Sequence, residues 1–317
     1  MITLENLTKR FGDHLAVDNL NVEIQPGRVT GFLGPNGAGK STTMRMILGL
    51  DRPTAGRALV GGRSYTDIAF PIRQVGALLD AKALHPGRSA RNHLKAMARS
   101  NQISLARVEE VLHEVGLQDA AGRRAGKYSL GMSQRLGIAG ALLGDPEVLI
   151  FDEPVNGLDP DGVRWVRRLA RSLSAEGRTV LVSSHLMSEM QLTADHLVVI
   201  GRGRLLMDAP IQEVVSGMVN KRVQLRIPEP GALMELARRL ASESLQVWRR
   251  GGDHLLVEGA SATELGDIAY EMDIRLHELR TLEGSLEDAY MALTGDSVEF
   301  GSGSGSRAPA AQNGRRS

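Results

Sequence analysis

The sequence predicts an α/β domain over roughly its first two thirds and a small α+β domain after it. Three observations support this prediction. Short apolar strands alternate with helical segments from Met1 to about Ala209, which is the pattern of an α/β domain. A glycine-rich loop directly follows one of these strands. The alternation restarts after a breaker-rich stretch, Ser216 to Asn220, and 317 residues suit one large and one small domain.

The first domain contains an opening strand and five further β-rich runs. The chain begins with the strand-like residues MITLENL. From Leu105 onward apolar side chains recur with helical period, with Ser104 placed to cap the helix and Gly116 near its end. We therefore expect a helical subdomain at about 81–144, with its helices between 88 and 144, inside a domain of residues 1–215. The β-rich runs are Val29 to Leu33, Val75 to Leu79, Val148 to Phe151, Val180 to Ser183 and Leu197 to Ile200.

The second domain, at 221–294, is predicted to run strand, helix, strand, strand, helix, strand. An alternative is that this region is one long irregular extension of the main sheet. Ser285 to Leu293 is expected to form a final helix, and residues 295–317, which end in GSGSGSRAPAAQNGRRS, are expected to form a flexible tail. The expected elements are strand Val223 to Ile227, helix Ala232 to Ser242, strands Leu245 to Trp248 and His254 to Glu258, helix Ala262 to Met272 and strand Arg275 to Leu279.

Composition excludes several classes of function. A formal net charge of +1 gives no electrostatic reason to expect nucleic acid, and aromatic residues at 3% leave no platform for stacking bases. The absence of cysteine excludes disulfides, thiolate metal sites and cysteine nucleophiles, and fits a reducing compartment. No stretch approaches the roughly 18 apolar residues that span a bilayer, and no secretory leader opens the chain. We expect a cytoplasmic protein, whose work at a membrane would require a second polypeptide.

The loop GFLGPNGAGKSTT lies between the strand Val29 to Leu33 and a helical run, Thr42 to Leu50. Its glycines allow successive backbone N–H groups to converge on phosphate oxygens at a helix N-terminus. Lys40 is expected to reach the β- and γ-phosphates, and the Ser41 hydroxyl to bind magnesium. The alternative is a chance glycine turn. The residues expected to bind nucleotide here are Gly34, Pro35, Asn36, Gly37, Ala38, Gly39, Lys40, Ser41 and Thr42.

An acidic pair, Asp152 and Glu153, ends the buried strand of VLIFDEP. This geometry places one carboxylate beside a metal and the other beside an attacking water. Asp152 is therefore expected to hold Mg²⁺, directly or through water, and Glu153 to polarise the water as general base. The alternative, a solvated acidic pair at a strand end, is weakened by the phosphate loop.

Three further motifs point to one family. YSLGMSQRLGIAGALL places an exposed serine and glycine at a helix N-terminus; Asn156 to Pro160 follow the acidic pair, and Ser183 to His185 follow a later strand. In this order and spacing the motifs resemble the nucleotide-binding subunits of ATP-binding cassette (ABC) transporters, over residues 1 to about 215. The resemblance implies a P-loop NTPase cassette, with a RecA-like core, an antiparallel β-subdomain and a helical subdomain.

The resemblance also implies roles for individual residues. Two ATP molecules would lie between two chains, with the phosphate loop of one copy facing the signature residues Ser129, Gly131 and Met132 of the other. His185 resembles the switch histidine that senses the γ-phosphate, and Asp159 the residue that links the two sites across the dimer; a capped loop histidine is the alternative for His185. Phe11 stands where members of the family have an aromatic residue that stacks on adenine, and Val17 where a residue packs beside the ribose. The alternative is that both are core residues, which would have the same sequence pattern.

Two positions depart from the family pattern. The signature is usually LSGGQ, whereas the aligned residues here are Tyr128 to Met132, so Leu130 replaces a glycine and Met132 a glutamine. Asp80 stands where a magnesium-sensing glutamine is common. It is expected to bind the metal through water or to act as a relay, with a solvated loop acid as the alternative; an ionised aspartate cannot donate a hydrogen bond. Both departures resemble the ATPases of antibiotic and bacitracin-type export systems.

We therefore expect an ATPase that uses ATP and Mg²⁺, forms a homodimer or pairs with a similar ATPase, and drives a separate ABC-type membrane permease for export of a drug, antibiotic or lipid-like substrate. It would lie at the inner face of the cell membrane through that permease, and no nucleic-acid partner is expected. One alternative is a non-transport cassette protein in translation or DNA maintenance, and another is a regulatory module whose second domain binds a ligand or mediates dimer contacts. The basic stripe Arg164, Arg167, Arg168 and Arg171 is interpreted as a solvated helix face.

Overall fold

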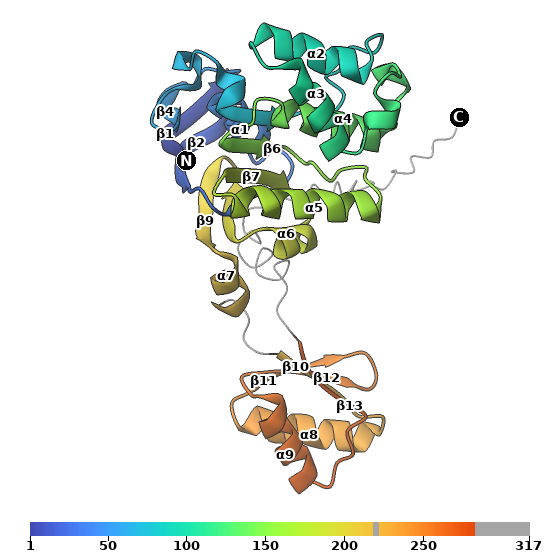
Figure 1. Cartoon of the computed structure of the whole chain (residues 1–317). Helices are drawn as coiled ribbons and strands as arrows, with labels where there is room; N and C mark the ends of the chain where they lie inside the picture. The colour runs from blue at the N-terminus through green and yellow to red at the C-terminus, as the bar shows by residue number, and fades with distance from the viewer. Residues whose placement is uncertain (218–221, 283–317) are drawn as a thin grey trace, which may run out of the picture.

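The computed structural model describes residues 1–217 and 222–282; the predicted helix Ser285 to Leu293 and the predicted tail lie outside this part. A six-stranded sheet forms the centre of the first domain (Figure 1). All its strands are parallel except β9, which pairs antiparallel with β8. In sheet order these strands are β5 (Val75–Leu78), β6 (Val148–Phe151), β7 (Thr179–Ser184), β3 (Val29–Leu33), β8 (His196–Gly201) and β9 (Arg204–Pro210).

A three-stranded antiparallel sheet lies beside it, as the family resemblance predicts. Its strands, in order, are β2 (His14–Ile24), β1 (Ile2–Phe11) and β4 (Ala55–Val60). Alternate residues of the central strands serve two cores, because side chains alternate across a strand. Phe32 packs into the core shared with the antiparallel sheet and with α1 (Lys40–Ile47), whereas Val29 and Leu33 pack into the other core. The sheet is therefore buried on both faces, which explains its continuous apolar strands.

The other face of the sheet is covered by α5 (Pro160–Ala175) and α6 (Met187–Thr193). The helical subdomain contains α2 (Ala90–Ser100), α3 (Leu105–Glu114) and α4 (Leu130–Leu142), and lies at the upper right of Figure 1. The predicted cap is present, since Ser104 Oγ accepts the Ala106 N–H at 3.3 Å. Helix α7 (Ile211–Gly217) follows β9.

The helix after the phosphate loop differs from its predicted bounds. It runs over Lys40–Ile47 and not over Thr42 to Leu50. It starts earlier because Gly39, at its N-cap, has the left-handed φ of 104° that lets the loop turn directly into the helix. It stops earlier because Gly49 has a φ of 64°, outside the helical range.

The second domain has a sheet and a core of its own. Its elements are β10 (Arg222–Arg226), α8 (Pro230–Ser242), β11 (Gln246–Arg250), β12 (His254–Glu258), α9 (Ala262–Glu271) and β13 (Glu278–Leu282). The strands form an antiparallel sheet in the order β11, β12, β10, β13, with the two helices on one face (Figure 1). An irregular extension of the main sheet, the alternative interpretation, is therefore wrong.

The predicted last strand, Arg275 to Leu279, is misplaced. The strand is β13, three residues later, and Leu282 pairs with Arg222 at its end. Ile274 and Leu276 instead pack into the core of this domain before the strand begins. Their apolar alternation resembles that of a strand, but backbone pairing with β10 decides where the strand starts.

Candidate active site

The loop between β3 and α1 borders a cavity of about 300 Å³. Gly39 is required in this loop, because a Cβ there would lie 2.5 Å from the Ala16 carbonyl oxygen. The first N–H groups of α1 have no partner inside the helix and, with the helix dipole, favour an anion. The residues that line the cavity are Phe11, His14, Ala16, Pro35, Asn36, Gly37, Gly39, Lys40, Ser41, Thr42, Asp152 and Glu153.

Two predicted loop residues support the cavity without lining it. A Cβ on Gly34 would lie 2.5 Å from the Ile200 carbonyl oxygen, so the loop passes β8 at a distance that only glycine allows. Ala38 is buried, and its N–H donates to the Pro35 carbonyl at 3.1 Å. These contacts fix the curvature that brings the loop N–H groups together.

Lys40 is the buried cation of the site, with only 7% of its surface exposed. Its ammonium donates to the carbonyl oxygens of Gly34, at 2.6 Å, and Pro35, at 3.3 Å. Burial lowers the pKa of Lys40, and the nearby carboxylates of Glu153 and Asp152 oppose that change. A charged group held in this way favours an anionic ligand beside it.

Asp152 joins the loop to the strand ends. Its Oδ2 accepts the Ser41 hydroxyl at 2.6 Å, and its Oδ1 accepts the Ser183 hydroxyl. Strands β6 and β7 are parallel neighbours, so the residues that follow them meet at the same sheet edge. The two residues expected to hold a metal, Ser41 and Asp152, are thus brought into direct contact.

Glu153 has a left-handed backbone, with φ at 48°. Its N–H donates to the Ser183 hydroxyl at 2.8 Å, and its Oε2 lies 2.9 Å from His185 Nδ1. A non-glycine residue in this region costs roughly 1–3 kcal/mol and persists where its surroundings hold it. The predicted base and the predicted switch histidine therefore form one hydrogen-bonded unit at the cavity.

The signature residues lie elsewhere in the chain. Ser129 caps α4, its hydroxyl accepting the Met132 N–H at 3.2 Å, and Gly131 follows in the first turn. None of these three lines the cavity around Lys40. Asp159 caps α5 by accepting the Gly162 N–H at 2.7 Å. Within one chain, the predicted nucleotide contacts thus form two separate groups.

Phe11 and Val17, the two residues expected beside adenine and ribose, differ from each other in exposure. Phe11 is 48% exposed, lines the cavity, and lies under the Lys9 ammonium, 4.7 Å from its ring centre. Val17 is fully buried and packs in the core shared with the antiparallel sheet. Val17 does not line the cavity, whereas the residue before it, Ala16, does.

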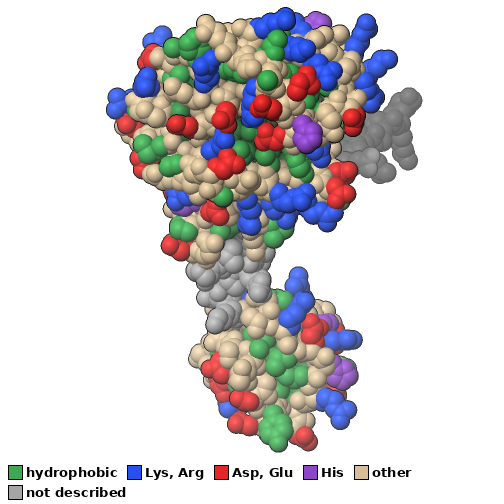
Figure 2. Space-filling view, viewed as in Figure 1, with side chains coloured by type: hydrophobic (Ala, Val, Ile, Leu, Met, Phe, Trp, Pro, Cys, Tyr) green, Lys and Arg blue, Asp and Glu red, His purple; other side chains and the backbone are tan. Residues whose placement is uncertain are grey.

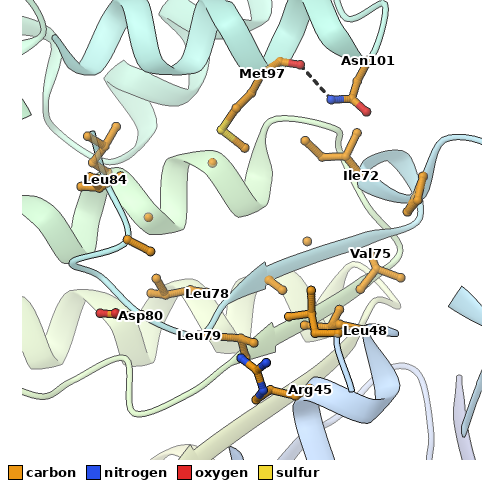
Figure 3. Close-up of a pocket in the computed structure, with 18 of the residues that line it drawn as sticks. Arg45, Leu48, Ile72, Val75, Leu78, Leu79, Asp80, Leu84, Met97 and Asn101 are labelled. Atoms are coloured by element: carbon orange, nitrogen blue, oxygen red, sulfur yellow. Dashed lines mark hydrogen bonds between the residues drawn. The ribbon is translucent and has the colours of Figure 1, made fainter. Parts of the chain in front are cut away.

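Asp80 does not line the loop cavity. It follows β5 at the edge of a second cavity of about 660 Å³, between the sheet and the helical subdomain (Figure 3). Its Oδ1 accepts the Lys82 N–H at 2.8 Å. The loop cavity does not include Asp80, so its expected role at the metal stays a prediction.

Comparisons with known proteins agree with this geometry. The ABC transporter family profile matches residues 17–156, and a profile for a domain of unknown function matches residues 221–287. An uncharacterized ABC transporter ATP-binding protein of Bacillus subtilis is 35% identical over 306 residues, 94% of this chain and 97% of that protein. The bacitracin transport ATP-binding protein of Bacillus licheniformis is 36% identical, covering 93% of this chain and 97% of that protein.

The chain belongs to the ABC transporter ATP-binding proteins. A solved structure of an ATP-binding subunit of an ABC transporter matches the fold with a TM-score of 0.62 at 25% identity, covering 68% of this chain and 91% of that one. The expected family and the expected P-loop NTPase cassette are confirmed. The chain is accordingly an ABC ATPase, and the loop cavity contains most of the residues predicted to bind its nucleotide.

Leu130, which departs from the signature of this ABC ATPase, is 41% exposed and lies close to Gly157. A Cβ on Gly157 would lie 2.1 Å from Leu130 Cδ2, and one on Gly131 would lie 3.2 Å from Leu158 Cδ2. The leucine that replaces the signature glycine thus lies against the loop that leads to Asp159. The signature and this loop are packed as one surface.

The sequence prediction missed four residues that line the loop cavity or bind the acidic pair beside it. His14 and Ala16 line the cavity from β2, and no motif marks them. Ser183, assigned no role, binds both Asp152 and Glu153. Gln134, 4% exposed on α4, donates to the Glu153 carbonyl at 3.2 Å. Gln134 stands between Ser133 and Arg135, so no local pattern in the sequence marks it as buried.

The arginine stripe on α5 of the ABC ATPase is only partly a solvated face. Figure 2 shows basic side chains gathered over this helix. Arg167 pairs with Glu189 of α6 at 2.9 Å, and Arg171 donates to the Thr193 carbonyl at 3.5 Å. These two side chains connect α5 to α6, although Arg171, like Arg164 and Arg168, is exposed. The interpretation as a solvated face therefore holds for three of the four arginines, and Arg167 is the exception.

Proposed function

We propose that the chain binds ATP with Mg²⁺ at the loop cavity, hydrolyses it with Glu153, and works as one of two ATPase subunits that drive a separate membrane permease. The observation that carries the proposal is the hydrogen-bonded series Ser41, Asp152, Ser183, Glu153 and His185, which begins in the phosphate loop and ends at the predicted switch. It supports the proposal because the residues that we propose for the metal and for the base lie in one hydrogen-bonded series.

The residues present fit a magnesium ion delivered with nucleotide. The Ser41 hydroxyl and the Asp152 carboxylate are oxygen donors in contact with each other. No cluster of three His, Asp or Glu side chains suited to a metal occurs among residues 1–217 and 222–282. Mg²⁺ is usually held by one or two carboxylates plus substrate phosphates, which matches this sparse set. Ser41 and Asp152 would hold the ion, and it would neutralise charge on the phosphates.

Glu153 and His185 supply the remaining chemistry. The carboxylate of Glu153 would accept a proton from the water that attacks the γ-phosphate, while its hydrogen bond to His185 fixes its direction. Lys40 and the first N–H groups of α1 would orient the phosphates and stabilise their charge. Catalysis in phosphoryl transfer rests mainly on such positioning.

A second copy would complete each site. Ser129, at the exposed N-terminus of α4, does not line the cavity of its own chain. A two-fold dimer presents the same surface twice, so each α4 N-terminus would meet the phosphates bound by the other chain. Asp159, which caps the neighbouring helix α5, would then lie at the link between the two sites.

Mixing two inactive variants is expected to restore activity. In a mixed dimer of Lys40→Ala and Ser129→Arg, one site carries both defects and the other carries none. An equal mixture should give measurable phosphate release of at most about a quarter of the wild-type rate, because about half of the dimers are mixed and each has one intact site. Each variant alone should be inactive. A mixture that stays inactive, with dimers present by light scattering, would show that sites do not form between chains.

The partner surface we propose is the cavity between β5 and the helical subdomain. Apolar side chains line most of it, including Leu78, Leu84 and Ile72 (Figure 3). Asp80, which follows β5, stands at its edge. The described residues contain no helix with the length and apolar character to cross a bilayer. The occupant we propose is a cytoplasmic helix of the permease, whose apolar side chains would fill this groove.

Copurification tests this proposal. The chain would be co-expressed with a candidate permease tagged for capture, and phosphate release measured with Glu153→Gln as the inactive control. We expect the two to copurify, and Leu84→Glu, in the groove, to reduce capture about tenfold or more, because it buries an unpaired charge. Leu192→Glu, at an exposed leucine of α6, should not. Active ATPase without capture would favour a non-transport cassette protein.

The transported substrate is proposed from the relatives. The bacitracin transport protein of Bacillus licheniformis matches over nearly the whole chain, and its name gives an antibiotic as cargo. We propose export of a drug, antibiotic or lipid-like molecule, with the chain at the inner face of the cell membrane. The permease would mainly determine the substrate. Combining this ATPase with a different permease should therefore change which substrate is transported.

A further inference from the structure

Gln134 is a buried polar group that the reaction scheme above does not use. It lies in α4, among residues that are mostly apolar, with 4% of its surface exposed. A buried amide without a hydrogen bond destabilises a fold, so its partner is informative. That partner is the backbone of Glu153, whose carbonyl oxygen lies 3.2 Å from Gln134 Nε2.

The Glu153 peptide unit is held from several directions. Its N–H donates to the Ser183 hydroxyl, and its side chain contacts His185. Its carbonyl oxygen accepts from Gln134 and from the Asn156 N–H, the latter at 3.2 Å. This residue has the left-handed φ of 48°. The direction of its carboxylate depends on that backbone, because the side chain leaves from Cα. Gln134 is the one side-chain contact of this set that comes from the helical subdomain.

Helix α4 carries a second group that concerns ATP. Its N-cap is Ser129, five residues before Gln134, or about 7.5 Å along the helix axis. In the proposed dimer, Ser129 serves the ATP bound by the partner chain. A shift of α4 caused by that ATP would therefore move the donor that holds Glu153 in the chain's own site.

We propose that Gln134 is a positioning residue that holds the backbone of Glu153 and makes hydrolysis at one site faster when ATP is bound at the other. This inference rests on the proposed function, and it adds a route by which the two sites communicate. We expect Gln134 to affect the rate of the chemical step, because it does not line the loop cavity that contains Lys40. Nucleotide affinity should therefore be independent of it.

The test compares Gln134→Met, which keeps the length but cannot donate, with Gln118→Met, at an exposed glutamine of the helical subdomain. We expect Gln134→Met to lower kcat about tenfold, because a base held out of position loses much of its effect. KM for ATP, and Kd for a non-hydrolysable ATP analogue, should change less than about twofold, and the Hill coefficient for ATP should fall toward one. Gln118→Met should match the wild type.

A second variant covers the case in which Gln134→Met fails to fold. Gln134→Glu keeps the shape, but an ionised carboxylate cannot donate to the Glu153 carbonyl, so kcat should fall in the same way. An unchanged kcat in a folded variant, or equal losses of kcat, ATP affinity and Tm, would overturn the inference. Absence of turnover in the wild type would instead count against the proposed function, which separates the two failures.

Discussion

Glu153→Gln is expected to lower ATP turnover by about 10²- to 10⁴-fold, the range that a positioned general base contributes. The amide has nearly the same shape as the carboxylate, so the backbone contacts to Ser183 and Gln134 should survive. Nucleotide binding should persist, since Lys40 and the loop are unchanged. Phosphate release and the Kd for ATP, measured on the same sample, check this.

Glu147→Gln is a matched control for that experiment. Glu147 is exposed and stands just before β6, at the opposite end of the strand that leads to Glu153. Its turnover should equal that of the wild type. We also expect Glu153→Gln to lengthen the lifetime of the ATP-bound dimer, seen as a larger dimer fraction by size exclusion with ATP. Rapid turnover by Glu153→Gln would remove Glu153 from the role of base.

Lys40→Ala is expected to weaken the binding of ATP, the step that precedes hydrolysis. The ammonium is buried at the loop cavity, beside the carbonyl oxygens of Gly34 and Pro35. Hydrogen bonds to charged groups contribute about 1.5–3 kcal/mol, so ATP should bind roughly 10- to 150-fold more weakly. Equilibrium binding of a fluorescent ATP analogue measures this directly, and turnover should fall with it.

The control for this change is Lys95→Ala, on α2 of the helical subdomain. It removes the same charge away from the loop, so ATP affinity should remain within about twofold of the wild type. If Lys40→Ala bound ATP as tightly as Lys95→Ala does, the loop cavity would not be the phosphate site. Different results for Lys40→Ala and Glu153→Gln would separate the binding step from the chemical step.

The phosphate loop and the acidic pair could be predicted from the sequence because their chemistry is local. Glycines at 37 and 39, followed by Lys40 and Ser41, define the loop within a few consecutive residues. The strand before Asp152 has four buried residues in a row, which places the carboxylate at a strand end. The helix N-caps at Ser104 and Ser129 are local in the same way, because each serine hydroxyl accepts a backbone N–H from two or three residues later in the chain.

Contacts between distant elements were harder to foresee. The contact of Gln134 with Glu153 joins residues 19 positions apart, and that of Ser41 with Asp152 joins residues 111 apart. The burial of Val17 and the start of β13 likewise depend on packing and strand pairing. A periodic apolar pattern gives the face of an element, but not the partner against which that face packs.

The sequence by itself determined the family, the alternation of strands and helices, and the residues of the phosphate loop, because these follow from patterns within short segments. Only the tertiary structure decided that Ser183 binds both acidic residues, that Arg167 and Arg171 contact α6, and that Asp80 lines the cavity beside the helical subdomain. These are contacts between separate elements, and their distances are set by how the sheets and helices pack.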